Sequence, residues 1–282
     1  MNDVYESIHV VWFKRDLRVH DHALLAEATR RGSVLPLYIC EPSVMHADDF
    51  SPHHWTFIRE SLCELRASLA ALGQPLVVRI GEAVDVLERL HQIYTVDGLW
   101  AHEETHNTTT YERDRAVRHW AKAHRIAFTE LPQHGVVRRL TSRDAWAGHW
   151  EQRMRVPQIS APSALPPIQE IDCGSIPTHA ELDLEDDMRV ERQKGGAAAA
   201  HDLLTSFLRQ RGQNYTRDMS SPLSAWDACS RLSAHIAWGT ISHKTIVQTA
   251  RAQASAIHIL FGNRFVPLLV AEPLPHQRAE SI

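Results

Sequence analysis

The 282-residue sequence predicts an α/β protein: a five-stranded parallel sheet with helices on both faces, followed by an all-α part. Short apolar runs alternate strictly with helical segments as far as residue 130. Such alternation is typical of parallel sheets, whose strands are buried on both faces. No strand pattern appears beyond residue 195, so the second part is expected to be helical.

The expected strands are short runs of buried apolar residues: Ile8–Phe13, Ser33–Ile39, Pro75–Ile80, Asp97–Ala101 and Ile126–Glu130. The helices between them are expected to start at an N-cap Asp21 and to cover Trp55–Leu72, Glu82–Tyr94 and Tyr111–His124. In the longest helix, leucines and Ile58 recur three and four residues apart and form one apolar stripe. Gly73 is expected to end that helix.

A charged turn, Trp12-Phe13-Lys14-Arg15-Asp16-Leu17-Arg18, follows the first strand. In parallel sheets, ligands bind at the carboxyl ends of the strands, so this turn is placed on the functional rim. For such a turn in isolation, a solvated loop is the simpler interpretation. Neither GxGxxG nor GxxxxGK[ST] occurs, so the usual marks of a phosphate loop are missing from the sheet.

A proline-rich stretch with an acidic patch, 156–194, is expected to be an interdomain linker that wraps over the surface. Helices are expected over Ala197–Arg211 and Leu232–Ala252, the second with a break at Gly239 and Ser242. Ser230-Arg231-Leu232-Ser233 lies at the start of that second helix. Free N–H groups, the helix dipole and hydroxyls attract phosphate there, which indicates a cradle for the pyrophosphate of a dinucleotide cofactor.

Composition limits the partners and the location. The net charge is −4, so nucleic-acid contact requires a local basic patch rather than an overall basic surface. The four cysteines form no CxxC pair, which argues against a zinc ribbon or disulfide scaffold and fits the reducing cytoplasm. The N-terminus is unlike a signal peptide, and no apolar run is long enough to span a bilayer, so no membrane partner is expected.

His102-Glu103-Glu104-Thr105-His106 matches the H-E-x-x-H string of zinc hydrolases. That chemistry needs both histidines on one helical face. Here the string starts where a strand ends, and Asn107 and three threonines, all poor helix formers, follow. A polar loop at the sheet rim is the preferred interpretation, with no metal site.

Two segments resemble one family. WFKRDLRVHDHALLAEA (12–28) is similar to the opening of DNA photolyases and cryptochromes. GGAAAAHDLLTSFL (195–208), YTRDMSSP and CSRLSAHIAWGTIS are similar to the start of that family's helical flavin-binding domain. The resemblance covers about residues 7–250. It implies an antenna-type α/β domain over 1–155, a linker over 156–194 and a partial FAD-binding domain over 195–252.

The resemblance implies FAD as the cofactor. Tyr215 matches the tyrosine beside the flavin, and the phosphate-binding stretch matches Cys229, Ser230, Arg231, Leu232 and Ser233. Cys229 and Ala234 replace the usual threonine and proline, and a thiol is the weaker hydrogen-bonding group. Arg217 matches an arginine that faces DNA. Thr109-Thr110 replace the Asn-Glu pair of folate-binding members, which argues against a folate antenna and leaves the pigment open.

The implied activity is that of a deoxyribodipyrimidine photo-lyase: light-driven electron transfer from FAD splits pyrimidine dimers in damaged DNA. A complete member is expected to be a monomer. A non-repairing blue-light photoreceptor or an inactive fragment is the alternative, and a zinc hydrolase is a third. Residues 253–282 match no family motif and are expected to be an atypical tail, from truncation or a shifted reading frame. No catalytic residue is assigned.

Overall fold

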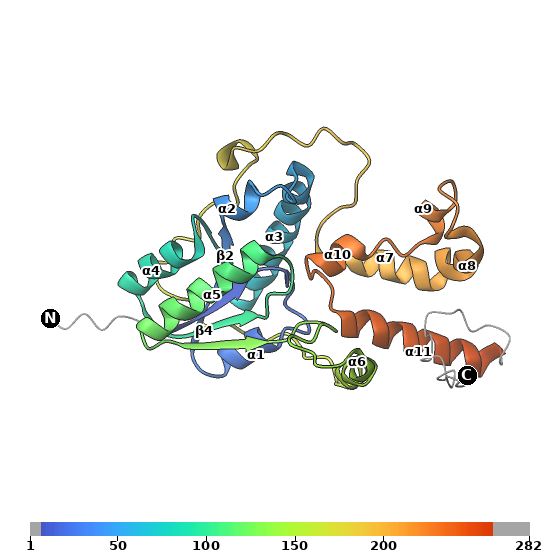
Figure 1. The fold of residues 1–282 in the computed structure, drawn as a ribbon, viewed down its shortest axis with the longest axis horizontal. Helices are drawn as coiled ribbons and strands as arrows, with labels where there is room; N and C mark the ends of the chain where they lie inside the picture. Colours follow the sequence, from blue (N-terminus) through green and yellow to red (C-terminus); the bar gives the residue numbers. More distant parts are fainter. Residues whose placement is uncertain (1–6, 262–282) are drawn as a thin grey trace, which may run out of the picture.

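The computed structural model describes residues 7–261, and the side chains as far as Ala254 (Figure 1). Five parallel strands form one sheet in the order β3-β2-β1-β4-β5. The strands are β1 (Ser7–Phe13), β2 (Ser33–Cys40), β3 (Val77–Ile80), β4 (Thr95–His102) and β5 (Ala127–Leu131). The predicted fold class is confirmed, and the predicted strand ends lie close to the observed ones.

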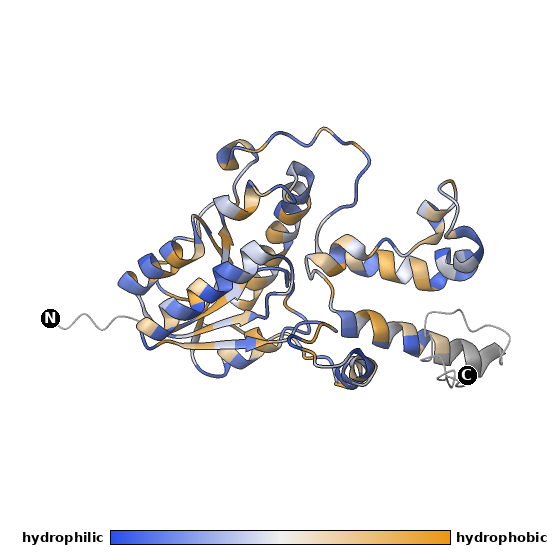
Figure 2. Ribbon diagram, viewed as in Figure 1, coloured by the Kyte–Doolittle hydropathy of each residue, from blue (hydrophilic) through white to orange (hydrophobic). Residues whose placement is uncertain are grey.

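Helices cover both faces of the sheet. One face packs against α1 (Ala23–Thr29) and α3 (Pro52–Leu72), and the other against α4 (Ala83–Ile93) and α5 (Thr108–Ala123). In β1, Val11 contributes to the first core and Val10 to the second, because alternate side chains point to opposite faces. Figure 2 shows apolar residues along the strands and polar residues on the outer helical surfaces.

Two helices start at residues other than those predicted. His22, not Asp21, caps α1, because its ring accepts a hydrogen bond from the Leu25 N–H. Asp21 has a positive φ of 51° and pairs instead with Lys244 at 2.6 Å. The α5 helix begins at Thr108, ahead of the predicted Tyr111, because Asn107 accepts from the Thr110 N–H at 2.9 Å and caps it.

After β5 the chain forms a short 3-10 turn (Arg143–Ala145) and α6 (Trp146–Arg155). The stretch predicted as a surface linker then packs into the α/β half. The Val78 N–H of edge strand β3 donates to the Cys173 carbonyl at 2.9 Å, and Leu165 and Ile168 are buried. The segment therefore covers the open edge of the sheet.

The remaining helices form a lobe beside the sheet (Figure 1). They are α7 (Ala197–Arg209), α8 (Tyr215–Asp218), α9 (Ala225–Ala228), α10 (Ser233–Ala237) and α11 (His243–Phe261). The predicted break at Gly239 separates α10 from α11. The α11 helix continues past Ala252, so the predicted tail begins as a helix, and 262–282 lie outside the described residues. No helix in the described part of the chain is long and apolar enough to cross a membrane.

Candidate functional site

The predicted phosphate-binding residues form an irregular connection between α9 and α10. Cys229 is extended, Arg231 has a positive φ of 58°, and Leu232 is buried in the core of the helical lobe. Ser233 is exposed and starts α10. That helix has only five residues, because the chain turns sharply at Gly239, where the sequence predicts a break. The dipole of such a short helix attracts an anion only weakly, so anion binding here depends mainly on side chains and local N–H groups.

The carbonyl groups of this connection are bound by side chains from elsewhere in the lobe. Arg211 donates to the Cys229 carbonyl and, at 3.3 Å, to the Ser230 carbonyl. Gln193 donates to the Arg231 carbonyl at 2.6 Å. These bonds fix the path of the backbone from Cys229 to Arg231. The sequence did not indicate these contacts, because no local motif marks an arginine that binds distant carbonyls.

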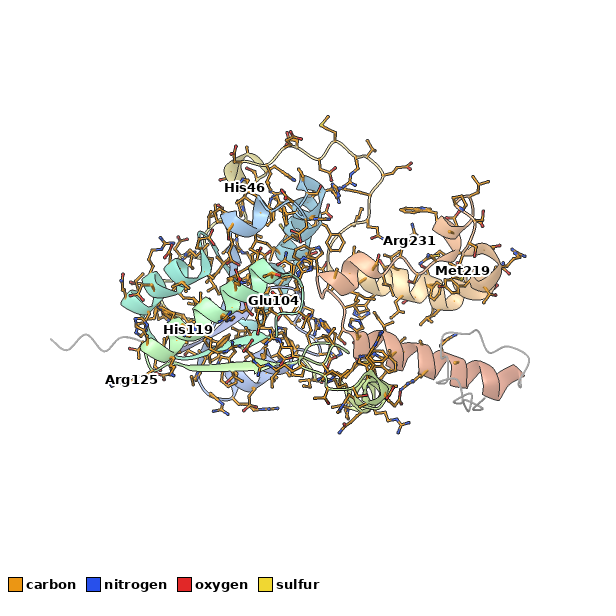
Figure 3. The ribbon with its side chains drawn as sticks, in the orientation of Figure 1. His46, Glu104, His119, Arg125, Met219 and Arg231 are labelled. Carbon is orange, nitrogen blue, oxygen red and sulfur yellow. The ribbon has the colours of Figure 1, made fainter. Side chains whose placement is uncertain are left out.

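Tyr215 is linked to the connection between α9 and α10 by packing contacts through Phe207 and Arg211. Its ring packs edge-on against Phe207 at 5.9 Å, and the Arg211 guanidinium lies 5.9 Å from the Phe207 ring. Arg217, two residues after Tyr215, is exposed and pairs with Asp218 at 2.7 Å. The structure thus brings Tyr215 and Cys229–Ser233 together in one lobe, where Figure 3 labels Arg231.

A second feature is a cavity of about 430 Å³ at the carboxyl ends of β1, β4 and β5. Its walls come from the β1 turn, the β4 and β5 loops, α6, α10 and the start of α11, and include Lys14, Arg15, Glu103, His134, Trp146, Trp150 and His243. The cavity lies where a parallel sheet of this order presents ligand sites. Aromatic side chains beside charged side chains of both signs, Glu103 and Glu104 among them, suit a planar polar molecule.

The charged turn after β1 is not a solvated loop. Lys14, Asp16 and Arg18 are all buried, and each has a partner. Lys14 pairs with Asp114 at 2.5 Å. Buried charges are stable only when they are paired, so the turn is a structural unit of the interior.

Beside it, Arg113 joins three carboxylates, those of Glu41, Glu104 and Asp114, at 2.7 to 2.9 Å. Burial raises the pKa of Glu41 to about 7, against the opposing effect of Arg113. Burial also acts to raise the pKa of Glu104, but Lys14 and Arg113 outweigh it and the pKa is lowered. This network occupies the rim between β1 and β2, where the remaining hollow is only about 40 Å³.

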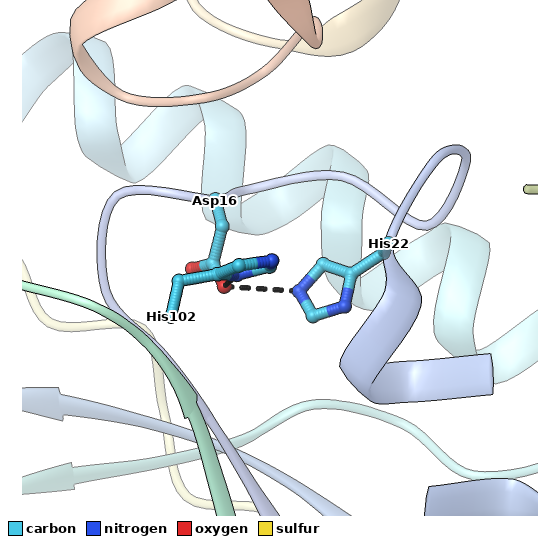
Figure 4. A group of neighbouring side chains, drawn as sticks. All are labelled: Asp16, His22 and His102. Carbon is cyan, nitrogen blue, oxygen red and sulfur yellow. Dashed lines mark hydrogen bonds and ion pairs between the residues drawn. The ribbon is translucent and has the colours of Figure 1, made fainter. Parts of the chain in front are cut away.

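Asp16, His22 and His102 form a buried cluster whose ligand atoms lie within 4.8 Å of one another (Figure 4). Both rings contact one oxygen of Asp16, His102 at 2.6 Å and His22 at 3.0 Å. Because the other His22 nitrogen accepts the Leu25 N–H, the nitrogen facing Asp16 carries the proton. A metal would have to displace that proton, and a metal-bound histidine normally donates from its second nitrogen. The cluster is therefore a hydrogen-bonded clamp.

The pKa values agree with that assignment. Burial acts to raise the pKa of Asp16, but hydrogen bonds from His102 and His22 hold it well below its usual range. Burial lowers the pKa of His102 to about 4, so its ring is neutral at pH 7. In the H-E-x-x-H string, His102 ends β4 and turns to Asp16, whereas His106 faces Asp49 from the loop. The two histidines are not on one helical face, as the loop interpretation predicted.

Known proteins match most of the chain. The family model for DNA photolyase matches residues 9–144. A cryptochrome DASH from Gloeobacter violaceus is 30% identical over 80% of this chain and 51% of its own length. A deoxyribodipyrimidine photo-lyase from Streptomyces griseus is 27% identical over 96% of this chain and 60% of its own length.

Solved structures agree on the fold. A Synechocystis cryptochrome aligns with a TM-score of 0.75 and 20% identity over 89% of this chain and 56% of its own. A class III photolyase from Agrobacterium tumefaciens aligns with a TM-score of 0.75 and 19% identity, over 92% and 55%. The chain spans between about half and three fifths of the length of these relatives. The family-model match and the curated relatives show that the chain belongs to the photolyase/cryptochrome family, and the solved structures agree with its fold.

Proposed function

We propose that the lobe over 195–252 is part of an FAD-binding domain and that Cys229–Ser233 bind the FAD phosphates. The observation that carries this proposal is Arg231. Its guanidinium lies 4.7 Å from the Trp226 ring, and its Nε is buried without a hydrogen-bond partner among the described residues. An unpaired buried donor on a cation is costly, and a phosphate oxygen would satisfy both its charge and its N–H.

The neighbouring groups support the same ligand. Ser233 is exposed, and the half-buried Ser230 hydroxyl, which accepts from the Leu232 N–H at 3.5 Å, can still donate to a phosphate. Bound FAD would supply the light-absorbing electron donor. In this proposal Tyr215 lies beside the flavin and Arg217 contacts a DNA phosphate, which positions the duplex without reading its sequence. The substrate is a pyrimidine dimer, which must leave the base stack to be reached.

The test is the flavin content of the purified chain. We expect FAD to bind, and Arg231→Met to weaken binding about tenfold or more, since a hydrogen bond to a charged group contributes about 1.5–3 kcal/mol. Arg30→Met is the matched control, because the Arg30 side chain is 72% exposed at the end of α1. A folded, colourless chain that ignores added FAD contradicts the proposal.

Photolyase and photoreceptor functions are separated by repair. Under blue light, a photolyase restores the intact bases of dimer-containing DNA, whereas a photoreceptor bleaches and recovers while the DNA stays damaged. We favour photolyase-type repair, with the photoreceptor as the alternative. Repair that is absent despite bound FAD supports the photoreceptor.

We also propose that the rim cavity holds a second chromophore. Its volume of about 430 Å³ and its aromatic and charged walls suit a planar polar pigment. A Sulfolobus tokodaii photolyase, which aligns with a TM-score of 0.68, was solved with two FAD molecules that imply a light-harvesting cofactor in that protein. Chromophores extracted from the protein isolated from its natural host are expected to include a pigment beyond one FAD. An extract with a single FAD per chain contradicts this.

A cytoplasmic monomer is the proposed state of the protein. The four cysteines are unpaired, which suits a reducing compartment. Sedimentation of the flavin-loaded protein gives the oligomeric state directly.

A further inference from the structure

The corner that joins α10 to α11 rests on the charged turn after β1. The Leu17 N–H donates to the Trp238 carbonyl at 3.1 Å. The Arg18 guanidinium donates to the Gly239 carbonyl at 2.9 Å and to the Asp21 carbonyl at 3.1 Å. Leu17 and Arg18 are both buried. The α/β half therefore binds the backbone of the helical lobe directly at this corner.

The contact requires glycine at position 239. Gly239 has a φ of +63°, a conformation that other residues rarely adopt. A Cβ atom there would overlap the Arg15 carbonyl oxygen and lie 2.6 Å from the Asp16 Cα. The Arg15 guanidinium lies 4.4 Å from the ring centre of Trp238 and covers the same corner. The two backbones approach so closely that no side chain fits between them.

This corner lies only one short helix away from the phosphate-binding residues. Trp238 directly follows α10, whose five residues begin at Ser233. At 1.5 Å per residue, the two ends of α10 are separated by roughly 7 Å. Because only five helical residues separate the corner from the segment, holding the C-terminal end of α10 limits where its start can lie. Beyond the corner, Lys244 in the first turn of α11 pairs with Asp21 at 2.6 Å.

We propose that the β1 turn orders the segment Cys229–Ser233, with Arg18 and Gly239 as positioning residues for the flavin phosphates. The β1 turn fixes the segment from its C-terminal side, whereas Arg211 and Gln193 fix its carbonyls from within the lobe. The inference rests on the proposed FAD site for its consequence, but the ordering is a property of the chain itself. Flavin affinity thereby depends on Arg18, which lies more than 200 positions before the segment and 221 residues before its partner Gly239.

The test combines hydrogen–deuterium exchange of the flavin-free full chain with FAD titration. Gly239→Ala and Arg18→Met are expected to raise exchange at least tenfold in peptides covering 229–237, without a change in β1, β2 and β4. Gly148→Ala is the matched control, because a Cβ at Gly148 meets nothing within 4 Å. Arg18→Lys, which keeps one donor for the Gly239 carbonyl, is expected to give an intermediate exchange rate. The dissociation constant for FAD is expected to rise at least tenfold in Gly239→Ala and Arg18→Met.

The outcomes separate this inference from the proposed function. Unchanged exchange in 229–237 for Arg18→Met overturns the inference, even if Gly239→Ala fails to fold. Equal effects of Arg18→Lys and Arg18→Met also overturn it, because the hydrogen bond to Gly239 would then be irrelevant. If the segment responds as expected but the unmodified chain binds no FAD, the ordering stands and the proposed function fails.

Discussion

Arg211 holds the backbone of Cys229–Ser233, the proposed phosphate-binding segment, in place. It donates to the carbonyls of Cys229, Ser230 and Leu203, the last at 3.0 Å, and to the Ser206 hydroxyl at 3.0 Å. A carbonyl oxygen that accepts from the Arg211 cation repels a nearby anion less than a free carbonyl oxygen does. The arginine thus favours anion binding by removing acceptors from the site.

Replacing Arg211 by Met should weaken FAD binding about tenfold or more and speed exchange in the segment. The change removes charged hydrogen bonds worth about 1.5–3 kcal/mol each, part of which water replaces. Fluorescence titration of FAD measures the effect. The control is Arg209→Met, whose side chain is exposed at the end of α7. Equal affinities for the two variants would contradict the role of Arg211.

Some of these residues can be predicted from the sequence and others cannot. The sequence predicts Ser230, Arg231 and Ser233 as phosphate-binding residues, because hydroxyls and an arginine just before a helix form a local pattern. From its sequence neighbours, Arg211 looks like a solvated residue at a helix end, because the Cys229 and Ser230 carbonyls that it binds are 18 and 19 residues away in the chain. The Asp16 clamp escapes prediction for the same reason, since Asp16 and His102 are 86 residues apart.

Capping residues determine where the helices of the α/β half begin. Asn107 caps α5 and also donates to Asp49 at 2.8 Å. Asn107→Ala should lower the free energy of unfolding by about 1 kcal/mol, the usual cost of a lost N-cap. Urea denaturation measures the change. Asn214→Ala is the control, because Asn214 precedes α8 without a side-chain capping bond; a loss of equal size there would contradict the assignment.

Elements with strong periodicity are predicted well, and those shaped by distant contacts are not. The strands follow from continuous apolar runs, and the end of α3 follows from Gly73, whose φ is 116°. The burial of Leu165 and Ile168 depends on contacts with Leu72 and Gln74 at the end of α3. No local pattern specifies those partners, which is why the sequence indicates a surface linker instead.

The molecule as a whole should be sensitive to acid. Burial lowers the pKa values of His102, His235 and His243 to about 4, the last with help from His134 and Arg18. In the unfolded chain each has a pKa of about 6.5. Between these values the unfolded state binds more protons, so stability falls as the pH drops from 6.5 to 4. Each histidine contributes a slope of about 1.4 kcal/mol per pH unit at most.

Glu41 acts in the opposite direction, because its pKa is raised to about 7 and its folded form gains a proton before the unfolded form does. The three histidines destabilise the folded state on acidification more than Glu41 stabilises it, so the net result is a loss of stability. Urea midpoints at pH 7 and pH 5 measure it. His235→Phe is expected to flatten the dependence, because it removes one of the three groups. A midpoint that rises on acidification would contradict the expectation.

The covered edge of β3 has a consequence for how this chain can be recombined with its relatives. Residues 165–182 supply Leu165, Ile168 and Leu182 to the cores of the α/β half. In a chimaera joined at residue 155, residues 165–182 would come from the other parent. They would then pack against the β3 edge and the end of α3 of this chain, whose side chains they do not match. Met188 and Val190 are 85% and 96% exposed, so the chain there makes few contacts that a junction could break. A crossover near residue 188 is therefore expected to yield soluble hybrids where one at 155 yields aggregates.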